Sequence, residues 1–230
     1  MQELLLNKEY RADILFFAAS VALVVLYHLY LRYRLRNNPH YSFQGVIRIT
    51  RTRWVSDIMA DPSRTIVGVQ TLRNSTMAAT FFASTAILLI MGTLTLSGQS
   101  DKLTESWHLL NVLGSSKPGI WIAKVIFLLS DFMVAFFSFA MSVRLFHHVG
   151  YLLRMPANDQ PGIVTPKTVA LHLNRAGYYY SIGMRAYYLS IPLVFWLFGP
   201  RFMLFATVVL IFVLYRTDRA PELDQGSVLD

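Results

Sequence analysis

Charged side chains lie inside the apolar stretches of this chain, where they are costly. Lys124 and Asp131 fall in the stretch 120–143, seven residues apart, which is about two helical turns, or roughly 10 Å, along one face. Ser138 continues that face, and Arg201, in the stretch 187–215, could pair with Asp131. Ionised groups inside a membrane cost about 2.5–3.5 kcal/mol on insertion scales and are candidate functional groups. The pattern predicts either a polar path for an ion, proton or anion, or a structural ion pair that fixes helix packing.

Three histidines are candidate ligands for a haem or a metal. His28 lies near the end of the first apolar stretch, and His147 and His148 follow the third. Histidines from two helices at one membrane face can hold a b-type haem or a transition metal. No closely spaced carboxylate–histidine motif accompanies them, so a structural role is favoured and no cofactor is expected.

Catalytic signatures are missing from the sequence. It contains no G-x-S-x-G elbow, H-E-x-x-H motif, Walker loop or Rossmann glycine run. It also lacks cysteine, which excludes thiolate metal sites and cysteine nucleophiles. We therefore expect a protein that is not an enzyme.

The composition is that of a membrane protein. Of the 230 residues, 54% are hydrophobic and 15% are charged, whereas soluble domains have about 25% charged residues. A spanning helix needs about 20 mostly apolar residues to cross about 30 Å of hydrocarbon. Four stretches meet this requirement: 14–30, 77–96, 120–143 and 187–215. The sequence predicts an all-α integral membrane bundle, one domain over 1–230, with about four transmembrane helices.

The fourth stretch is interrupted at Gly199-Pro200, with Pro192 upstream. Proline removes a backbone donor and clashes with the preceding turn, so a kink or a break is expected. One interpretation is a single kinked helix, and the other is two half-helices that form a re-entrant hairpin. The kinked helix is the favoured interpretation.

Basic residues indicate an orientation. Most of the 21 lysines and arginines lie in two loops, 31–75 and 144–186. The positive-inside rule places these loops in the cytoplasm and, with four spans, both chain ends outside. We expect a bacterial inner membrane whose anionic headgroups meet the basic loops. A nucleic-acid partner is not expected, although the net charge is +8, because the basic residues crowd beside apolar stretches.

The first basic loop has structure of its own. Apolar residues fall on one side of a helical wheel, namely Val46, Ile47, Trp54 and Ile58. They predict an amphipathic helix in the headgroup layer. Asp61-Pro62 then resembles an N-cap followed by proline at the first helical position. The helix that begins there is expected to continue past Arg73 into the second apolar stretch.

Small side chains recur every four residues in the second apolar stretch. One row is Ser75, Ala79 and Ala83, and the neighbouring row includes Thr80 and Ser84. Small residues let helix backbones approach closely inside a membrane. The rows predict close packing within the chain or, alternatively, a homo-oligomer interface.

Several short groups of residues together resemble a family signature. They are Arg73 with Asn74, then Arg144, then Arg185 with Tyr187 and Tyr188, and finally Gly199-Pro200. Their order and spacing from about residue 44 to 218 are similar to those of the membrane family named domain of unknown function 599. The resemblance implies a multi-pass membrane protein of bacteria and plants, and it implies no activity.

Three functions agree with these patterns. The first is an oligomeric channel-like or transporter-like protein with Lys124, Asp131, Ser138 and Arg201 near its path. The second is a non-catalytic accessory or scaffold subunit of a larger membrane complex. The third is a haem- or metal-binding redox protein that uses His28, His147 or His148.

Overall fold

The chain folds as a bundle of long helices. A computed structural model describes residues 2–37, 41–98, 118–155 and 164–219. Within these residues no strand is present, which confirms the predicted all-α class. The helices are α1 (Gln2–Asn37), α2 (Phe43–Ala60), the 3-10 helix η1 (Pro62–Arg64), α3 (Thr65–Gly98), α5 (Pro118–Leu152), α6 (Pro166–Phe198) and α7 (Pro200–Asp218).

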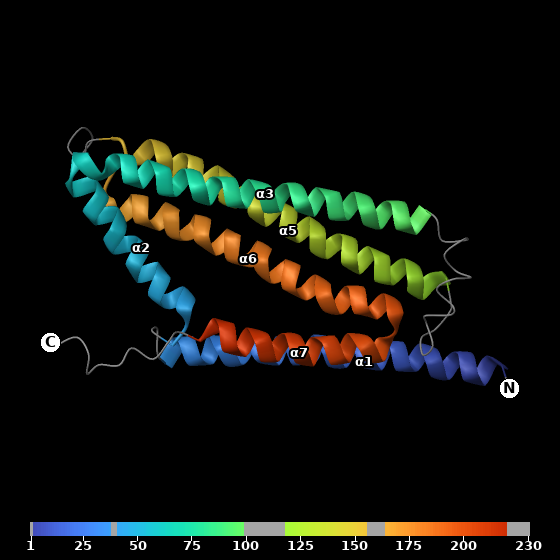
Figure 1. Ribbon diagram of the computed structural model, residues 1–230. Coiled ribbons are helices and arrows are strands. Elements are labelled where there is room, and N and C mark those ends of the chain that lie inside the picture. The colour runs from blue at the N-terminus through green and yellow to red at the C-terminus, as the bar shows by residue number, and fades with distance from the viewer. Residues whose placement is uncertain (1, 38–40, 99–117, 156–163, 220–230) are drawn as a thin grey trace.

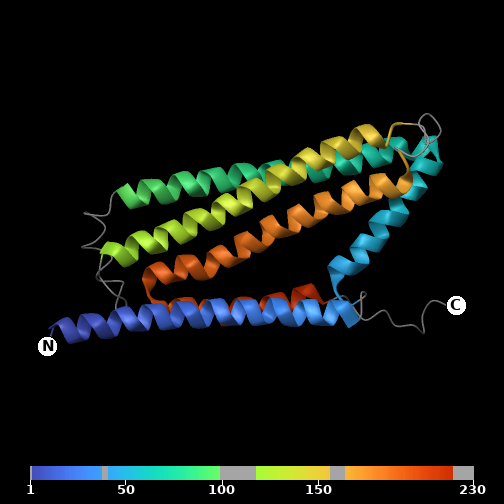
Figure 2. The same cartoon turned by 180° about the vertical axis from the view of Figure 1, so that it is seen from behind.

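Five long helices lie side by side along one direction. Figures 1 and 2 show α3, α5 and α6 on one side of the bundle and the pair α1 and α7 on the other. In order of contact, α3 packs on α5, α5 on α6, α6 on α7 and α7 on α1. The shorter α2 crosses one end of the bundle, from the end of α1 to the start of α3, and packs on α6 (Figure 1).

These five helices are long and apolar enough to cross a membrane. The prediction of a multi-pass helical bundle is confirmed, but the expected number of four is too small by one. The predicted stretch 187–215 is the source of the difference, because it contains the end of α6 and most of α7. At 33 and 19 residues, these helices extend about 50 Å and 28 Å at 1.5 Å per residue. Each therefore has roughly the length or more of a complete crossing.

The chain reverses direction at Gly199, so the favoured single kinked helix is wrong. Gly199 has φ 148° and ψ 156°, a conformation that essentially only glycine adopts. Pro200 takes the first position of α7, where its missing N–H would be unpaired in any residue. The hairpin alternative is closer, although its two arms are full-length helices rather than halves.

The two ends of the described helices lie at opposite ends of the bundle. α1 begins at one end, and α7 finishes at the other, beside the last turns of α1 (Figure 1). Four spans would have placed the start of α1 and the end of α7 on one side, whereas five helices long enough to cross place them at opposite ends of the bundle.

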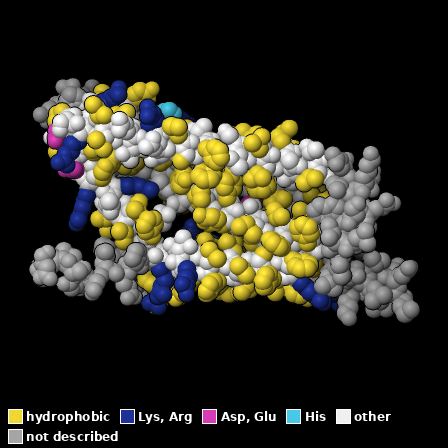
Figure 3. All heavy atoms as spheres, viewed as in Figure 1, with side chains coloured by type: hydrophobic (Ala, Val, Ile, Leu, Met, Phe, Trp, Pro, Cys, Tyr) yellow, Lys and Arg dark blue, Asp and Glu magenta, His cyan; other side chains and the backbone are white. Residues whose placement is uncertain are grey.

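One end of the bundle, called here the basic end, carries α2 and the last turns of α1 and α7. Its basic residues include Arg34, Arg36, Arg48, Arg53, Arg64 and Arg216. Figure 3 shows Lys and Arg side chains gathered around this end, while hydrophobic side chains cover the long helices. The stretches 31–75 and 144–186, predicted as loops, are largely helical, because a basic residue ends an apolar stretch without ending a helix.

A hydrophobic core at the basic end holds α2 in place. Val55 and Ile58 of α2 are buried with Leu145 and Val149 of α5 and Val169 of α6. The predicted helix in the first basic loop is thus confirmed as a helix. Its buried side includes Ile58 as expected.

The predicted start of the next helix is also confirmed. The Asp61 side chain accepts a hydrogen bond from the Ser63 backbone N–H, and Pro62 occupies the first helical position. After η1, the helix α3 runs unbroken past Arg73 to Gly98.

Small residues bring α3, α5 and α6 close together. In the first row on α3, Ala79 is fully buried and Ala83 packs against the cluster around Phe139. In the second row, Thr80 and Ser84 are exposed. The first row therefore packs within the chain, and the second row faces outward.

Candidate intramembrane site

A buried ion pair joins α1 and α5 near the end opposite to the basic end. Lys124 Nζ lies 3.6 Å from Asp13 Oδ1, and both side chains are 2% exposed. The same Asp13 oxygen accepts a hydrogen bond of 3.1 Å from Trp196 Nε1 of α6. The Lys124 ammonium also lies 5.6 Å from the centroid of the Trp196 ring, within the range of a cation–π contact. Both charges are thus matched, and three helices meet at this cluster.

A cleft of about 350 Å³ lies between α1, α5, α6 and α7. Most of its wall is apolar, with contributions from Phe17, Val21 and Val25 of α1, Phe127 and Val134 of α5, Leu193 of α6 and Met203 of α7. The polar side chains of its wall are Ser20, Ser130, Asp131 and Thr207. Asp131 is therefore the one charged residue that lines the cleft among the described parts of the chain.

Two polar atoms of this cleft have no hydrogen-bond partner in the described structure. They are Asp131 Oδ2 and Ser20 Oγ, and both atoms are buried. In contrast, the Thr207 hydroxyl donates to the Met203 carbonyl of its own helix. A buried carboxyl oxygen without a partner carries a desolvation cost, so its presence needs an explanation beyond packing.

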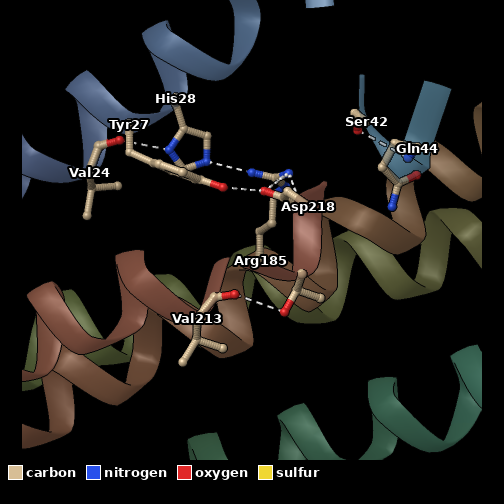
Figure 4. Close-up of polar contacts among 9 residues, drawn as sticks. Val24, Tyr27, His28, Ser42, Gln44, Arg185, Val213 and Asp218 are labelled. Atoms are coloured by element: carbon tan, nitrogen blue, oxygen red, sulfur yellow. Dashed lines mark hydrogen bonds and ion pairs between the residues drawn. The ribbon is translucent and has the colours of Figure 1, made fainter. Parts of the chain in front are cut away.

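A second polar cluster ties α1, α6 and α7 together at the basic end (Figure 4). Arg185 Nη2 of α6 donates to both carboxylate oxygens of Asp218 of α7, at 3.1 and 3.0 Å. Tyr27 of α1 donates its hydroxyl proton to Asp218 Oδ2 at 2.7 Å. Arg185 Nη1 lies 2.9 Å from Nε2 of His28, also on α1.

The contacts of His28 define its tautomer. Its Nδ1 lies 2.8 Å from the Val24 carbonyl oxygen, which can only accept, so Nδ1 carries the proton. Its Nε2 faces the Arg185 guanidinium, which can only donate, so Nε2 is the acceptor. Both ring nitrogens of His28 are therefore engaged.

The four residues of the predicted polar stripe do not form one connected group. Lys124 pairs with Asp13 rather than with a group on its own helix, and Ser138 is 7% exposed in the interior. Arg201 is exposed in the first turn of α7. The expected pairing of Arg201 with Asp131 is therefore not formed, because the reversal at Gly199 puts Arg201 at the end of a helix instead of mid-span.

The other two candidate histidines, His147 and His148, belong to a different helix from His28. His147 and His148 are exposed on α5, whereas His28 belongs to the Arg185 cluster. In the described ranges, no group of three His, Cys, Asp or Glu side chains is placed to hold a metal ion.

The residues of the family signature divide into exposed and interior positions. Arg73, Asn74 and Arg144 are exposed. Tyr187 donates its hydroxyl proton to the Phe82 carbonyl of α3, and Tyr188 packs beside Tyr27, Leu210 and Leu214. Arg185 holds the cluster at the basic end, and Gly199-Pro200 forms the reversal, so the interior positions of the signature lie at helix–helix contacts.

Sequence reasoning missed Asp13, Trp196, Tyr27 and Asp218 as members of these clusters. Asp13 directly precedes the predicted stretch 14–30, but α1 begins at Gln2 and includes it. The need of a buried Lys124 for a counter-charge was the signal that could have found Asp13. Asp218 follows the last apolar stretch, and only the α6–α7 hairpin brings it to Arg185.

Comparison with known proteins identifies a family but no function. No curated protein matches the chain significantly, and no solved structure does so. The profile of the family described as "Protein of unknown function, DUF599" matches residues 15–222. This match covers the helices α2 to α7 and nearly all of the apolar part of α1. Because the profile matches most of the chain, this chain belongs to the DUF599 family.

Proposed function

We propose that this protein is a transporter-like membrane protein without catalytic activity, in which the Asp131 carboxyl binds a proton or a cation inside the membrane. One observation carries the proposal, namely the unpartnered Oδ2 of Asp131 in a cleft of about 350 Å³. Ionisable groups at membrane depth are costly, and they commonly mark ion or proton pathways.

Two ion pairs inside the bundle support this choice by contrast. Lys124 is matched by Asp13, and Arg185 is matched by Asp218. These two pairs lie toward opposite ends of the bundle, and the Asp131 cleft lies between them along α1 and α5. A structural role explains the paired charges. Asp131, in contrast, lines a cleft, and its Oδ2 atom has no hydrogen-bond partner in the described structure.

The depth of Asp131 fits a role in crossing the membrane. The apolar part of α5 begins at Gly119, twelve residues before Asp131, which corresponds to about 18 Å. With the hydrocarbon core, about 30 Å thick, taken to begin at Gly119, Asp131 lies near its middle. Binding groups of transporters are commonly found at this depth, beside discontinuous helices.

The proposal includes an orientation in a bacterial inner membrane. The basic end faces the cytoplasm and its anionic lipid headgroups, so α1 begins outside and α7 finishes inside. Because the sequence contains no cysteine, a single introduced cysteine reports on which side of the membrane its position lies. Ser56→Cys on α2 should react with an impermeant maleimide only after the membrane is opened, and Gly119→Cys should react in intact cells. The reverse pattern would contradict the orientation.

The exposed row on α3 is the proposed contact of a homo-oligomer. Thr80 and Ser84 are small and face outward, which allows close helix approach between two copies. A Ser84→Cys variant is expected to form a disulfide-linked dimer in membranes. Leu88 is also exposed on this helix, one turn further along. A cysteine at Leu88 is the control that shows how disulfide formation depends on position along the helix.

Proton flux in proteoliposomes tests the proposed function. Vesicles loaded with potassium and a pH dye develop an inside-negative potential when valinomycin is added, and this potential drives proton entry. We expect the wild-type protein to acidify the lumen and Asp131→Asn to abolish the effect. Asp57→Asn is the matched control, because it makes the same chemical change at an exposed carboxylate of α2.

Equal flux through wild type and Asp131→Asn would contradict the assignment of Asp131. No flux from any variant, combined with co-purification of fixed partner proteins from native membranes, would favour the accessory-subunit alternative.

A further inference from the structure

We infer that the ligand of the Asp131 cleft is an organic cation with an apolar body, which enters from the hydrocarbon between α1 and α5. This inference rests on the proposed role of the cleft as the binding site. It adds the chemical class of the ligand and the route by which the ligand arrives.

The wall of the cleft favours an organic ligand over a bare metal ion. Ten of its fourteen lining residues are apolar. Inorganic cations such as Mg²⁺ and Ca²⁺ take about six or more oxygen ligands, whereas this wall offers one carboxyl and three hydroxyls. The Thr207 hydroxyl is already directed to the Met203 carbonyl. An apolar wall with one or two placed polar groups is typical of a site for a small organic molecule.

The opening of the cleft lies on the outer surface of the bundle. Val25 of α1 is 49% exposed and Val134 of α5 is 51% exposed, and both line the cleft. The floor consists of buried residues of α6 and α7, including Pro192 and Met203. Since Asp131 lies near mid-membrane by its distance along α5, this opening faces lipid tails. A ligand that arrives there must be soluble in hydrocarbon over most of its surface.

The charge of the ligand follows from Asp131. No other charged side chain lines the cleft among the described residues. Two charged pairs on the surrounding helices are engaged with each other, Asp13 of α1 with Lys124 of α5, and Arg185 of α6 with Asp218 of α7. A cation would supply the counter-charge that the carboxylate lacks, whereas an anion would be repelled.

Binding of the cation is coupled to loss of a proton. Without a cation, a lone carboxyl in an apolar cleft is neutral, because an unpaired charge there is strongly disfavoured. When the cation enters, the carboxyl O–H bond breaks, the proton passes to water, and the carboxylate pairs with the cation. The net charge of the occupied cleft equals that of the protonated cleft, so the exchange is electrically balanced within the membrane.

Octyltrimethylammonium is a suitable probe, because it has an apolar chain, a permanent charge and no proton of its own to release. The purified full-length protein in detergent is titrated with it in weakly buffered solution that contains a pH dye, and binding is followed in parallel by calorimetry. We expect release of about one proton per chain, because one carboxyl makes the exchange. Asp131→Asn should release none and bind roughly tenfold to hundredfold more weakly.

Matched compounds separate the contributions of charge and apolar body. The compound 2,2-dimethyldecane has the same shape without the charge, and tetramethylammonium has the charge without the chain. Both are expected to bind more weakly than the probe, and the neutral compound should release no proton. A Val25→Trp variant, which narrows the opening, should weaken binding of the probe while Asp131 is retained.

Three results would overturn the inference: equal binding by wild type and Asp131→Asn, equal binding of the neutral compound, or equal binding of tetramethylammonium. Failure of the ligand class is distinguishable from failure of the proposed function. Proton flux that depends on Asp131, without binding of the probe, would remove the organic cation and leave transport in place. Binding with proton release, but without flux in vesicles, would keep the ligand class and remove transport.

Discussion

Arg185 of α6 contacts the Asp218 carboxylate of α7 through a single nitrogen, Nη2, which lies 3.1 Å from Oδ1 and 3.0 Å from Oδ2. Its other terminal nitrogen faces His28 of α1. One guanidinium therefore joins three helices whose contact residues are far apart in sequence. The α6–α7 hairpin closes against α1 at this point, on the basic-end side of the Asp131 cleft.

Asp218→Asn should weaken this junction. Hydrogen bonds to charged groups contribute about 1.5–3 kcal/mol, and we expect a loss at the lower end, because the Arg185 and Asp218 side chains are 24% and 15% exposed. Thermal unfolding in one detergent measures the effect, with Asp57→Asn as the control at an exposed carboxylate. A double variant with Arg185→Gln should cost less than the sum of the single variants. Strict additivity would show that the two residues do not interact.

Removing one partner of the Lys124–Asp13 pair should be more damaging. A buried charge left without its partner costs about 3–5 kcal/mol, and both side chains here are 2% exposed. Lys124→Met and Asp13→Asn should each lower the apparent melting temperature strongly. The double variant removes both charges and should regain much of the loss. A double variant as unstable as the two losses combined would refute the pairing.

Gly199→Ala should destabilise the reversal between α6 and α7. Its φ of 148° forces a side chain into a conformation that costs about 1–3 kcal/mol. Gly119→Ala at the start of α5, where a Cβ meets nothing within 4 Å, is the matched control. Equal melting temperatures for the two variants would mean that the reversal adapts without strain.

Gly183→Ala tests the close approach of α5 and α6. A Cβ at Gly183 would lie 2.7 Å from Cζ of Phe139, whose ring is fully buried. Overpacking of this kind costs about 1–3 kcal/mol. Gly92→Ala on α3, where the surrounding space is open, should be neutral or slightly stabilising. If both variants melted together, the α5–α6 contact would be looser than these distances indicate.

Asp61 should make stability depend on pH. Hydrogen bonds from the Ser63 side chain and backbone N–H hold the pKa of Asp61 below its ordinary value of 3.8. The folded state therefore favours the ionised carboxylate, and its contribution is complete above about pH 4. The contribution falls as the pH drops below that value and through the lowered pKa. Asn also caps helices but does not titrate in this range.

The comparison of wild type with Asp61→Asn isolates the contribution of the ionised Asp61 carboxylate to stability. The difference between their melting temperatures should be larger at pH 6 than at pH 3. A difference that stays constant over this interval would show that the Asp61 carboxylate does not stabilise the start of α3 through its charge.

Local features of the fold were predictable from the sequence. The apolar stretches within α1, α3 and α5, the cap at Asp61-Pro62 and the interruption at Gly199-Pro200 each depend on residues close together in the chain. A helix satisfies its own backbone hydrogen bonds, so consecutive residues determine its length and its ends. The chemical types of the site residues were equally visible, since a lysine or an aspartate in an apolar stretch is conspicuous without any coordinates.

The partners of those residues were decided only by the tertiary structure. A Gly-Pro pair permits either a kink or a reversal, and the choice determined that Arg201 lies at a helix end and that Asp218 reaches Arg185. The choice of Asp13 as the partner of Lys124 depends on how α1 and α5 pack and rotate against each other. Helix packing is set by contacts between distant segments, so the sequence revealed the charged residues, and packing determined which of them were matched and which one, Asp131, faces a cleft.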